Sequence, residues 1–97
     1  MARTPIHPGE ILGDELVELG MSAAELARAI HVPANRVSQI IAGKRAVTAD
    51  TALRLGRWFG TGPQLWLNLQ QSYELRLAER DCGADIARIA PRTAPPP

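Results

Sequence analysis

The chain has 97 residues, 22% charged and 45% hydrophobic, which is the composition of one small globular domain. No apolar run approaches the roughly 18 residues that a membrane-spanning helix needs, and the N-terminal residues MARTPIHPGE lack the apolar stretch of a signal peptide. Cys82 is the single cysteine, which excludes an internal disulfide. We therefore expect a cytoplasmic protein with no membrane partner.

The net charge of +1 is unevenly distributed along the chain. Residues 1–27 carry one basic and five acidic residues, a net charge of −4, and residues 28–57 carry six basic residues and one acidic residue, a net charge of +5. Residues 58–97 are neutral overall. A basic middle segment indicates a surface that binds a polyanion, although charge alone does not distinguish such a surface from chance clustering.

Helix signals predict two helices in the first third of the chain. The first helix starts at Pro8, a favoured first helical residue, and ends at Gly20. Ser22 and Glu25 form a capping-box pattern that opens the second helix. The apolar residues expected to be buried by these two helices are Leu12, Leu16, Leu19, Leu26, Ala27 and Ile30.

The third and fourth predicted helices follow a tight break at residues 31–33, because a residue before proline resists the helical conformation. The third runs from about Pro33 to Ala42 and is closed by Gly43. Thr48 is a suitable N-cap for the fourth, which ends at Gly60. The apolar residues of the fourth helix expected to face the core are Ala52, Leu55 and Phe59.

The fifth predicted helix begins at Gly62-Pro63 and carries more apolar residues than one packed face can hide. A stripe that begins at Trp66 follows helical spacing, while Leu67 and Leu75 fall away from it. We expect Trp66, Leu67 and Leu75 to form a homodimer interface. The alternative is that Leu67 and Leu75 are scattered exposed leucines, which are common on protein surfaces. The pattern fades from about Asp81, so residues 1–80 are predicted to form the domain and residues 81–97 a proline-rich, mobile tail.

The second and third helices, with the short break between them, match a helix-turn-helix, in which the second helix enters the major groove of DNA. If Val37 and Ile40 face the core, the polar residues between them project outward together. Amide and guanidinium groups read base edges, and basic residues after the helix contact phosphates. The predicted DNA-binding residues are Ala34, Asn35, Arg36, Ser38, Gln39, Lys44 and Arg45.

The sequence also resembles the HigA-type antitoxins of the lambda-repressor-like (Xre-type) helix-turn-helix superfamily. The resemblance extends over roughly residues 7–80, in the stretches HPGEIL, ELARAIHVPANRVSQIIAGKR, VTADTALRLGRWFG and PQLWLNLQ. It implies an all-α, five-helix domain and a homodimeric repressor that binds a palindromic operator in its own operon. It further implies a protein partner, a small RelE-like toxin (HigB) that cleaves messenger RNA.

In the wider superfamily, base contacts come from the start and middle of the third helix, and the matching positions here are Ala34, Asn35 and Gln39. The Gln39 amide can make a bidentate contact with a base. Three positions depart from the family pattern. Ala34 replaces a frequent glutamine, Ala23 lacks the polar phosphate-binding side chain of some relatives, and His31 stands where many relatives have glycine. These departures leave the fold expectation intact but put the target DNA sequence in doubt.

The acidic residues Glu10, Asp14 and Glu18 share one face of the first helix. They form either an ordinary solvated face or a patch that attracts a basic toxin, for which the tail beyond Asp81 is the rival element. No arrangement of catalytic residues, metal ligands or cofactor-binding motifs is evident, so we expect no enzyme, metal or cofactor. Two further functions stay open: a stand-alone repressor without a toxin, and a pure protein-interaction domain.

Overall fold

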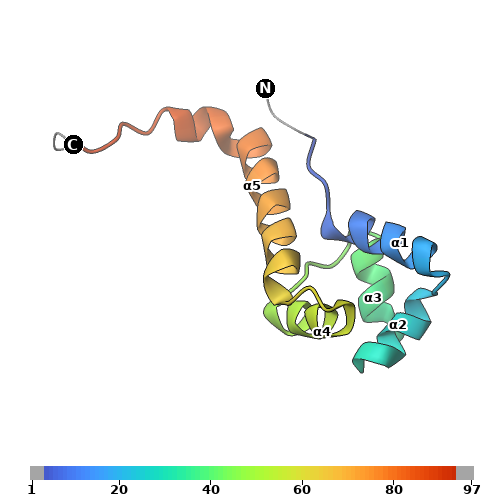
Figure 1. The fold of residues 1–97 in the computed structure, drawn as a ribbon. Helices are drawn as coiled ribbons and strands as arrows, with labels where there is room; N and C mark the ends of the chain where they lie inside the picture. The colour runs from blue at the N-terminus through green and yellow to red at the C-terminus, as the bar shows by residue number, and fades with distance from the viewer. Residues whose placement is uncertain (1–3, 94–97) are drawn as a thin grey trace.

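The computed structural model describes residues 4–93, which form five α-helices and no strand (Figure 1). The helices are α1 (Pro8–Leu19), α2 (Ala23–Ile30), α3 (Ala34–Ile41), α4 (Ala49–Phe59) and α5 (Pro63–Ala87). Helices α2 and α3 form the helix-turn-helix, with α1 and α4 packed around them. The predicted all-α, lambda-repressor-like fold is therefore confirmed. No helix within residues 4–93 is both long enough and apolar enough to cross a membrane.

The predicted helix starts depend on side-chain caps, and two of them are confirmed. Ser22 Oγ accepts a hydrogen bond from the Glu25 amide at 3.1 Å, and Glu25 Oε1 accepts one from the Ser22 amide at 2.9 Å. The Thr48 side chain caps α4 by accepting a hydrogen bond from the Thr51 amide. These bonds satisfy backbone N–H groups that have no partner inside the helix.

The core is formed by apolar residues from all five helices and from the loop before α4. Leu19 does not belong to it, contrary to prediction: it is 52% exposed because it lies in the last turn of α1, next to the Gly20 cap. Trp66 is only 2% exposed and packs against Phe59. The buried apolar residues are Leu12, Leu16, Leu26, Ala27, Ile30, Val37, Ile40, Val47, Ala52, Leu55 and Trp66.

The turn between α2 and α3 contains one residue with an unusual backbone conformation. His31 has a φ of +62°, the left-handed region, and caps the C-terminus of α2 with its amide. Residues with a Cβ adopt this conformation at a cost, and glycine adopts it freely. The geometry therefore favours glycine at a position where this chain carries histidine.

Helix α5 is longer than predicted. It continues through Asp81, where the sequence pattern fades, and ends only at Ala87. Every residue from Ala78 to Ala87 except Gly83 is exposed, and the C-terminal half of α5 extends away from the other helices (Figure 1). The division of the chain at residue 80 thus does not coincide with a helix end, and the last three prolines lie outside the described residues.

Helices α1 and α3 approach each other at Gly9. A Cβ atom at this position would overlap the carbonyl oxygen of Ile40 and lie within 2.9 Å of the Ile41 Cα. Gly13, one turn later on α1, is less constrained, because a Cβ there would meet only the Ile41 Cγ2 at 3.4 Å. Gly9 therefore permits the first turn of α1 to pack directly on the backbone of the last turn of α3.

We predict that Gly9→Ala lowers the free energy of unfolding by about 1–3 kcal/mol, because the added methyl must displace backbone atoms of α3. Gly13→Ala is the matched control on the same helix. It should leave stability unchanged or raise it by about 0.5–1 kcal/mol, because alanine favours the helix interior over glycine. Urea unfolding followed by circular dichroism measures both changes. Equal stability of the two variants would contradict the close approach of α1 to α3.

Candidate nucleic-acid interface

The outer face of α3 presents polar side chains to solvent. Val37 and Ile40 are buried, so the opposite side of the helix is turned outward, as predicted. On that side Asn35 and Ser38 are exposed, and Gln39 is half-buried at the edge. Ala34, at the start of the helix, is also exposed and offers only a methyl group. The face has the size and the amide and hydroxyl groups needed to contact base edges in a major groove.

Lys44 and Arg45 lie on the loop that follows α3, residues 43–47, here called the basic loop. Both residues are exposed. The loop is held at each end: the Lys44 amide donates to the Gln39 carbonyl oxygen at 2.8 Å, and the Val47 amide donates to Gln70 Oε1 at 2.8 Å. Gln70 is only 6% exposed and belongs to α5, so a buried bond joins the loop to the longest helix. The two basic side chains are therefore presented from a fixed backbone.

His7 ties the start of α1 to the basic loop. Its Nδ1 accepts a hydrogen bond from the Gly9 amide at 2.9 Å, and its ring lies beside the basic loop, where a Cβ atom on Gly43 would be 3.9 Å from His7 Cγ. The ring meets Tyr73 of α5 edge-on, with centroids 4.8 Å apart. Burial lowers the pKa of His7 below its ordinary value of 6.5, against the opposing influence of Glu10 and of the Arg45 backbone. The neutral ring is thus the form that fits the folded structure.

Arg36 is less free than the sequence indicated. Its Nη1 donates to Asp50 Oδ2 at 2.6 Å, and Arg54 Nε donates to the same carboxylate at 3.1 Å. These hydrogen bonds, with that from Arg54 the larger influence, lower the pKa of Asp50 from its ordinary value. The three side chains link α3 to α4, so Arg36 contributes to the position of the helix as well as to its charge. The spacing of Asp50 and Arg54, four residues apart on one helix, was a readable signal for this pair.

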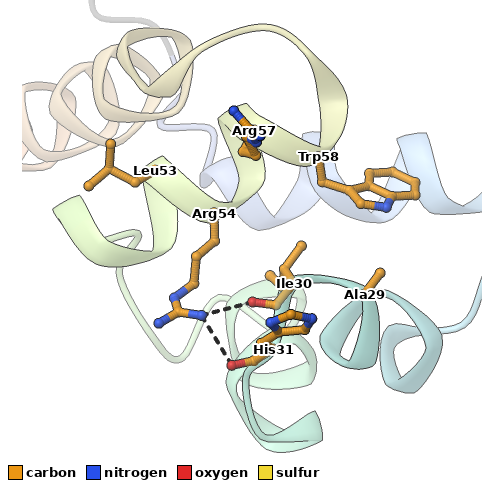
Figure 2. Close-up of a pocket in the computed structure, with 7 residues that line it drawn as sticks. All are labelled: Ala29, Ile30, His31, Leu53, Arg54, Arg57 and Trp58. Atoms are coloured by element: carbon orange, nitrogen blue, oxygen red, sulfur yellow. Dashed lines mark hydrogen bonds between the residues drawn. The ribbon is translucent and has the colours of Figure 1, made fainter.

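Arg54 also closes the C-terminus of α2. Its Nη1 donates to the carbonyl oxygens of Ile30 and His31, at 2.9 and 3.1 Å, across a shallow groove between α2 and α4 (Figure 2). A cation at this end of a helix also complements the helix dipole. The groove has a volume of about 320 Å³, and Leu53 and Trp58 line it while remaining partly exposed. Sequence reasoning missed both this capping role and the groove.

The remaining predicted site residues lie away from α3. The acidic residues of α1 are all exposed, but the Glu10 carboxylate is already bonded to the His7 amide as part of the helix cap. On α5, Leu75 is 63% exposed and Leu67 is partly buried against the core. Trp66, predicted as an interface residue, is enclosed by its own chain. The prediction for Trp66 is therefore wrong, because the side chain completes the core and offers no exposed surface.

Comparison with known proteins identifies the family of this chain. The helix-turn-helix family model matches residues 12–66. A solved structure from Coxiella burnetii, described as an addiction module antidote protein of a HigA family, is 49% identical, with a TM-score of 0.89 over 92% of this chain and 99% of that one. The chain belongs to the HigA family.

Two other HigA proteins support this assignment. Antitoxin HigA-1 of Vibrio cholerae is 38% identical over 74 residues, which cover 75% of this chain and 70% of that protein. The Pseudomonas aeruginosa antitoxin HigA, solved with the higBA promoter, is 48% identical with a TM-score of 0.87 over 92% of this chain and 99% of that chain. The residues matched by the helix-turn-helix family model, 12–66, include α3 and the basic loop, so the candidate interface lies within the matched region.

We predict a pH-dependent loss of stability that originates at His7. Because its pKa is lowered in the folded state, the unfolded chain binds a proton first as pH falls. The stabilisation is complete above the ordinary pKa of 6.5 and is lost as pH falls from there toward the lowered folded value. His7→Asn keeps a capping acceptor without a titratable ring. At pH 7.5 it should cost about 0.5–1.5 kcal/mol through loss of the contact with Tyr73.

Urea unfolding at several pH values between 7.5 and 5.5 measures this effect. The unmodified chain should lose stability over this range, and His7→Asn should lose clearly less. His31→Asn, which replaces the exposed histidine, is the matched control and should keep the pH dependence of the unmodified chain. The same loss in all three proteins would exclude His7 as its source.

Proposed function

We propose that this chain is an antitoxin that represses its own operon as a homodimer and neutralises a RelE-like, mRNA-cleaving toxin. The observation that carries the proposal is the exposed polar face of α3 beside the basic loop, in a chain similar over most of its length to a HigA solved with promoter DNA. In the proposed complex α3 enters the major groove, where Asn35, Ser38 and Gln39 face the bases. Lys44 and Arg45 contact phosphates and supply salt-dependent affinity.

Dimerisation is proposed because one helix-turn-helix buries too little surface for tight, specific binding. Two copies related by a two-fold axis span half-sites about 34 Å apart on one side of the duplex. Leu75 is the strongest candidate for the contact, because it is a large apolar side chain with most of its surface exposed. Leu67, eight residues earlier on the same helix, extends this surface toward the core.

Replacing Leu67 and Leu75 with glutamate should give a monomer whose operator affinity is at least roughly tenfold lower, because the second half-site no longer assists the first. Sedimentation velocity at micromolar concentration and titration of operator DNA measure the two effects. Leu75→Glu alone tests the same surface without disturbing the partly buried Leu67. Leu53→Glu, on the exposed face of α4, is the matched control and should leave the dimer intact. If Leu53→Glu dissociates the dimer and the Leu75 variants do not, the dimer interface lies on α4 and not on α5.

The acidic face of α1 is proposed to attract the toxin. Asp14 and Glu18 are exposed on α1, one turn apart, and lie on a different helix from the DNA-facing residues. A ribonuclease that binds messenger RNA carries basic surface, so opposite charges would accelerate the encounter. The separation of the two surfaces would allow DNA and toxin to be bound together. Glu10 contributes charge to the same face but also caps the helix.

Reversal of charge at Asp14 and Glu18 to lysine should slow association with the toxin by about tenfold at low salt and leave the fold intact. Glu10 is left unchanged so that the α1 cap is retained. The control, Glu79→Lys with Asp81→Lys, changes the net charge equally on the distal part of α5. Stopped-flow binding at several salt concentrations, with the product of the neighbouring reading frame, gives the rates. If toxin association is slower only in the control, toxin binding belongs to distal α5. Absence of a neighbouring toxin gene would favour the stand-alone repressor.

A further inference from the structure

Two of the candidate DNA-contacting side chains are bonded to each other. Arg45 Nε donates a hydrogen bond to Gln39 Oε1 at 2.9 Å. Only the oxygen of a carboxamide accepts a hydrogen bond, so this contact fixes which end of the Gln39 amide faces Arg45. One of the two lone pairs of the amide oxygen is thus engaged and the oxygen is directed toward Arg45, so the NH₂ group is the end left fully available to a base.

The position of Arg45 is set by several elements. The basic loop is bonded to α3 at its first residues, through the Gly43 and Lys44 amides, and to Gln70 of α5 at Val47. His7, the N-cap of α1, lies beside the same loop, where a Cβ atom on Gly43 would be 3.9 Å from its Cγ. The guanidinium group thus projects from a backbone that is bonded to α3 and α5 and packed against the start of α1. Such support favours one geometry of the pair before any DNA is bound.

The pair changes what Gln39 can recognise. A free glutamine amide both donates and accepts, and this combination suits adenine, which offers N7 as acceptor and its N6 amino group as donor. With its oxygen directed toward Arg45, the Gln39 amide is oriented so that it presents its NH₂ donors first. Guanine offers two acceptors, N7 and O6, in the same groove, whereas the N6 amino group of adenine would face the NH₂ group donor to donor. The restrained amide is thus suited to guanine.

We infer that Arg45 is a specificity-determining residue, which makes Gln39 read guanine in preference to adenine by holding its amide oxygen. This inference rests on the proposed DNA binding and adds the base that one position of the operator should contain. Only Nε of Arg45 is engaged by Gln39, so its remaining N–H groups stay available to a phosphate. Arg45 thus has two separable roles: it adds charge, and it orients the reading side chain.

The test measures base preference in operator DNA. Fragments from the promoter of the chain's own gene are prepared with all four bases at each position, and binding of the full chain is followed by fluorescence anisotropy. The position read by Gln39 is the one whose preference disappears in Gln39→Ala. There the unmodified chain should prefer guanine to adenine by roughly 5- to 100-fold. In Arg45→Met, whose side chain has no hydrogen-bond donor, the ratio of the affinity for guanine to the affinity for adenine should fall severalfold.

Lys44→Ala is the matched control on the same loop. It should weaken binding to every fragment alike and reduce the salt slope by about one unit, with an unchanged base profile. An unchanged profile in Arg45→Met would overturn the inference and leave Arg45 a phosphate contact only. Adenine preference in the unmodified chain at the Gln39 position would overturn it too. Failure of the unmodified chain to distinguish promoter DNA from a scrambled fragment would instead overturn the proposed function, and this inference with it.

Discussion

The contact of α1 with the backbone of α3 at Gly9 is the constraint on which the rest of the candidate interface depends. Since no side chain separates the two helices there, the first turn of α1 lies on the last turn of α3. This closeness brings His7, the N-cap of α1, beside the basic loop, where a Cβ atom on Gly43 would be 3.9 Å from His7 Cγ. The packing at Gly9 consequently contributes both to the position of α3 and to the position of the basic loop.

Several side chains proposed to face DNA are held in place by hydrogen bonds within the protein. Arg36 is bonded to Asp50, Arg45 to Gln39, and Ser38 to the carbonyl oxygen of Asn35. Each of these bonds lies on the surface and restrains one polar group before DNA is bound. Their combined effect is to limit the conformations that the face adopts before binding, which reduces the entropy lost on association. The face is therefore a partly ordered surface whose preferences are influenced by residues outside α3.

Local signals in the sequence were sufficient for most of the fold. The Ser22–Glu25 capping box, the break at Pro33 and the glycines after α1 and α4 depend on neighbouring residues, and the structure confirms them. Bonds between distant residues carried no such signal, as with Gln70 and Val47 or Arg54 and the end of α2. Trp66 was misassigned for a related reason: helical spacing shows that a residue belongs to an apolar stripe, but not whether its own chain or a partner covers it.

The bond between Val47 and Gln70 can form only after α5 has left the ribosome, which is later than the helix-turn-helix. The contacts between α2 and α3 are local and need little of the chain, whereas the bond from Val47 to Gln70 spans 23 residues and requires α5. His7 likewise meets Tyr73 only when that late helix has docked. A nascent chain can thus form its helix-turn-helix early while the basic loop is still unsupported. The surface proposed to read DNA is completed by α5, which leaves the ribosome after the four preceding helices.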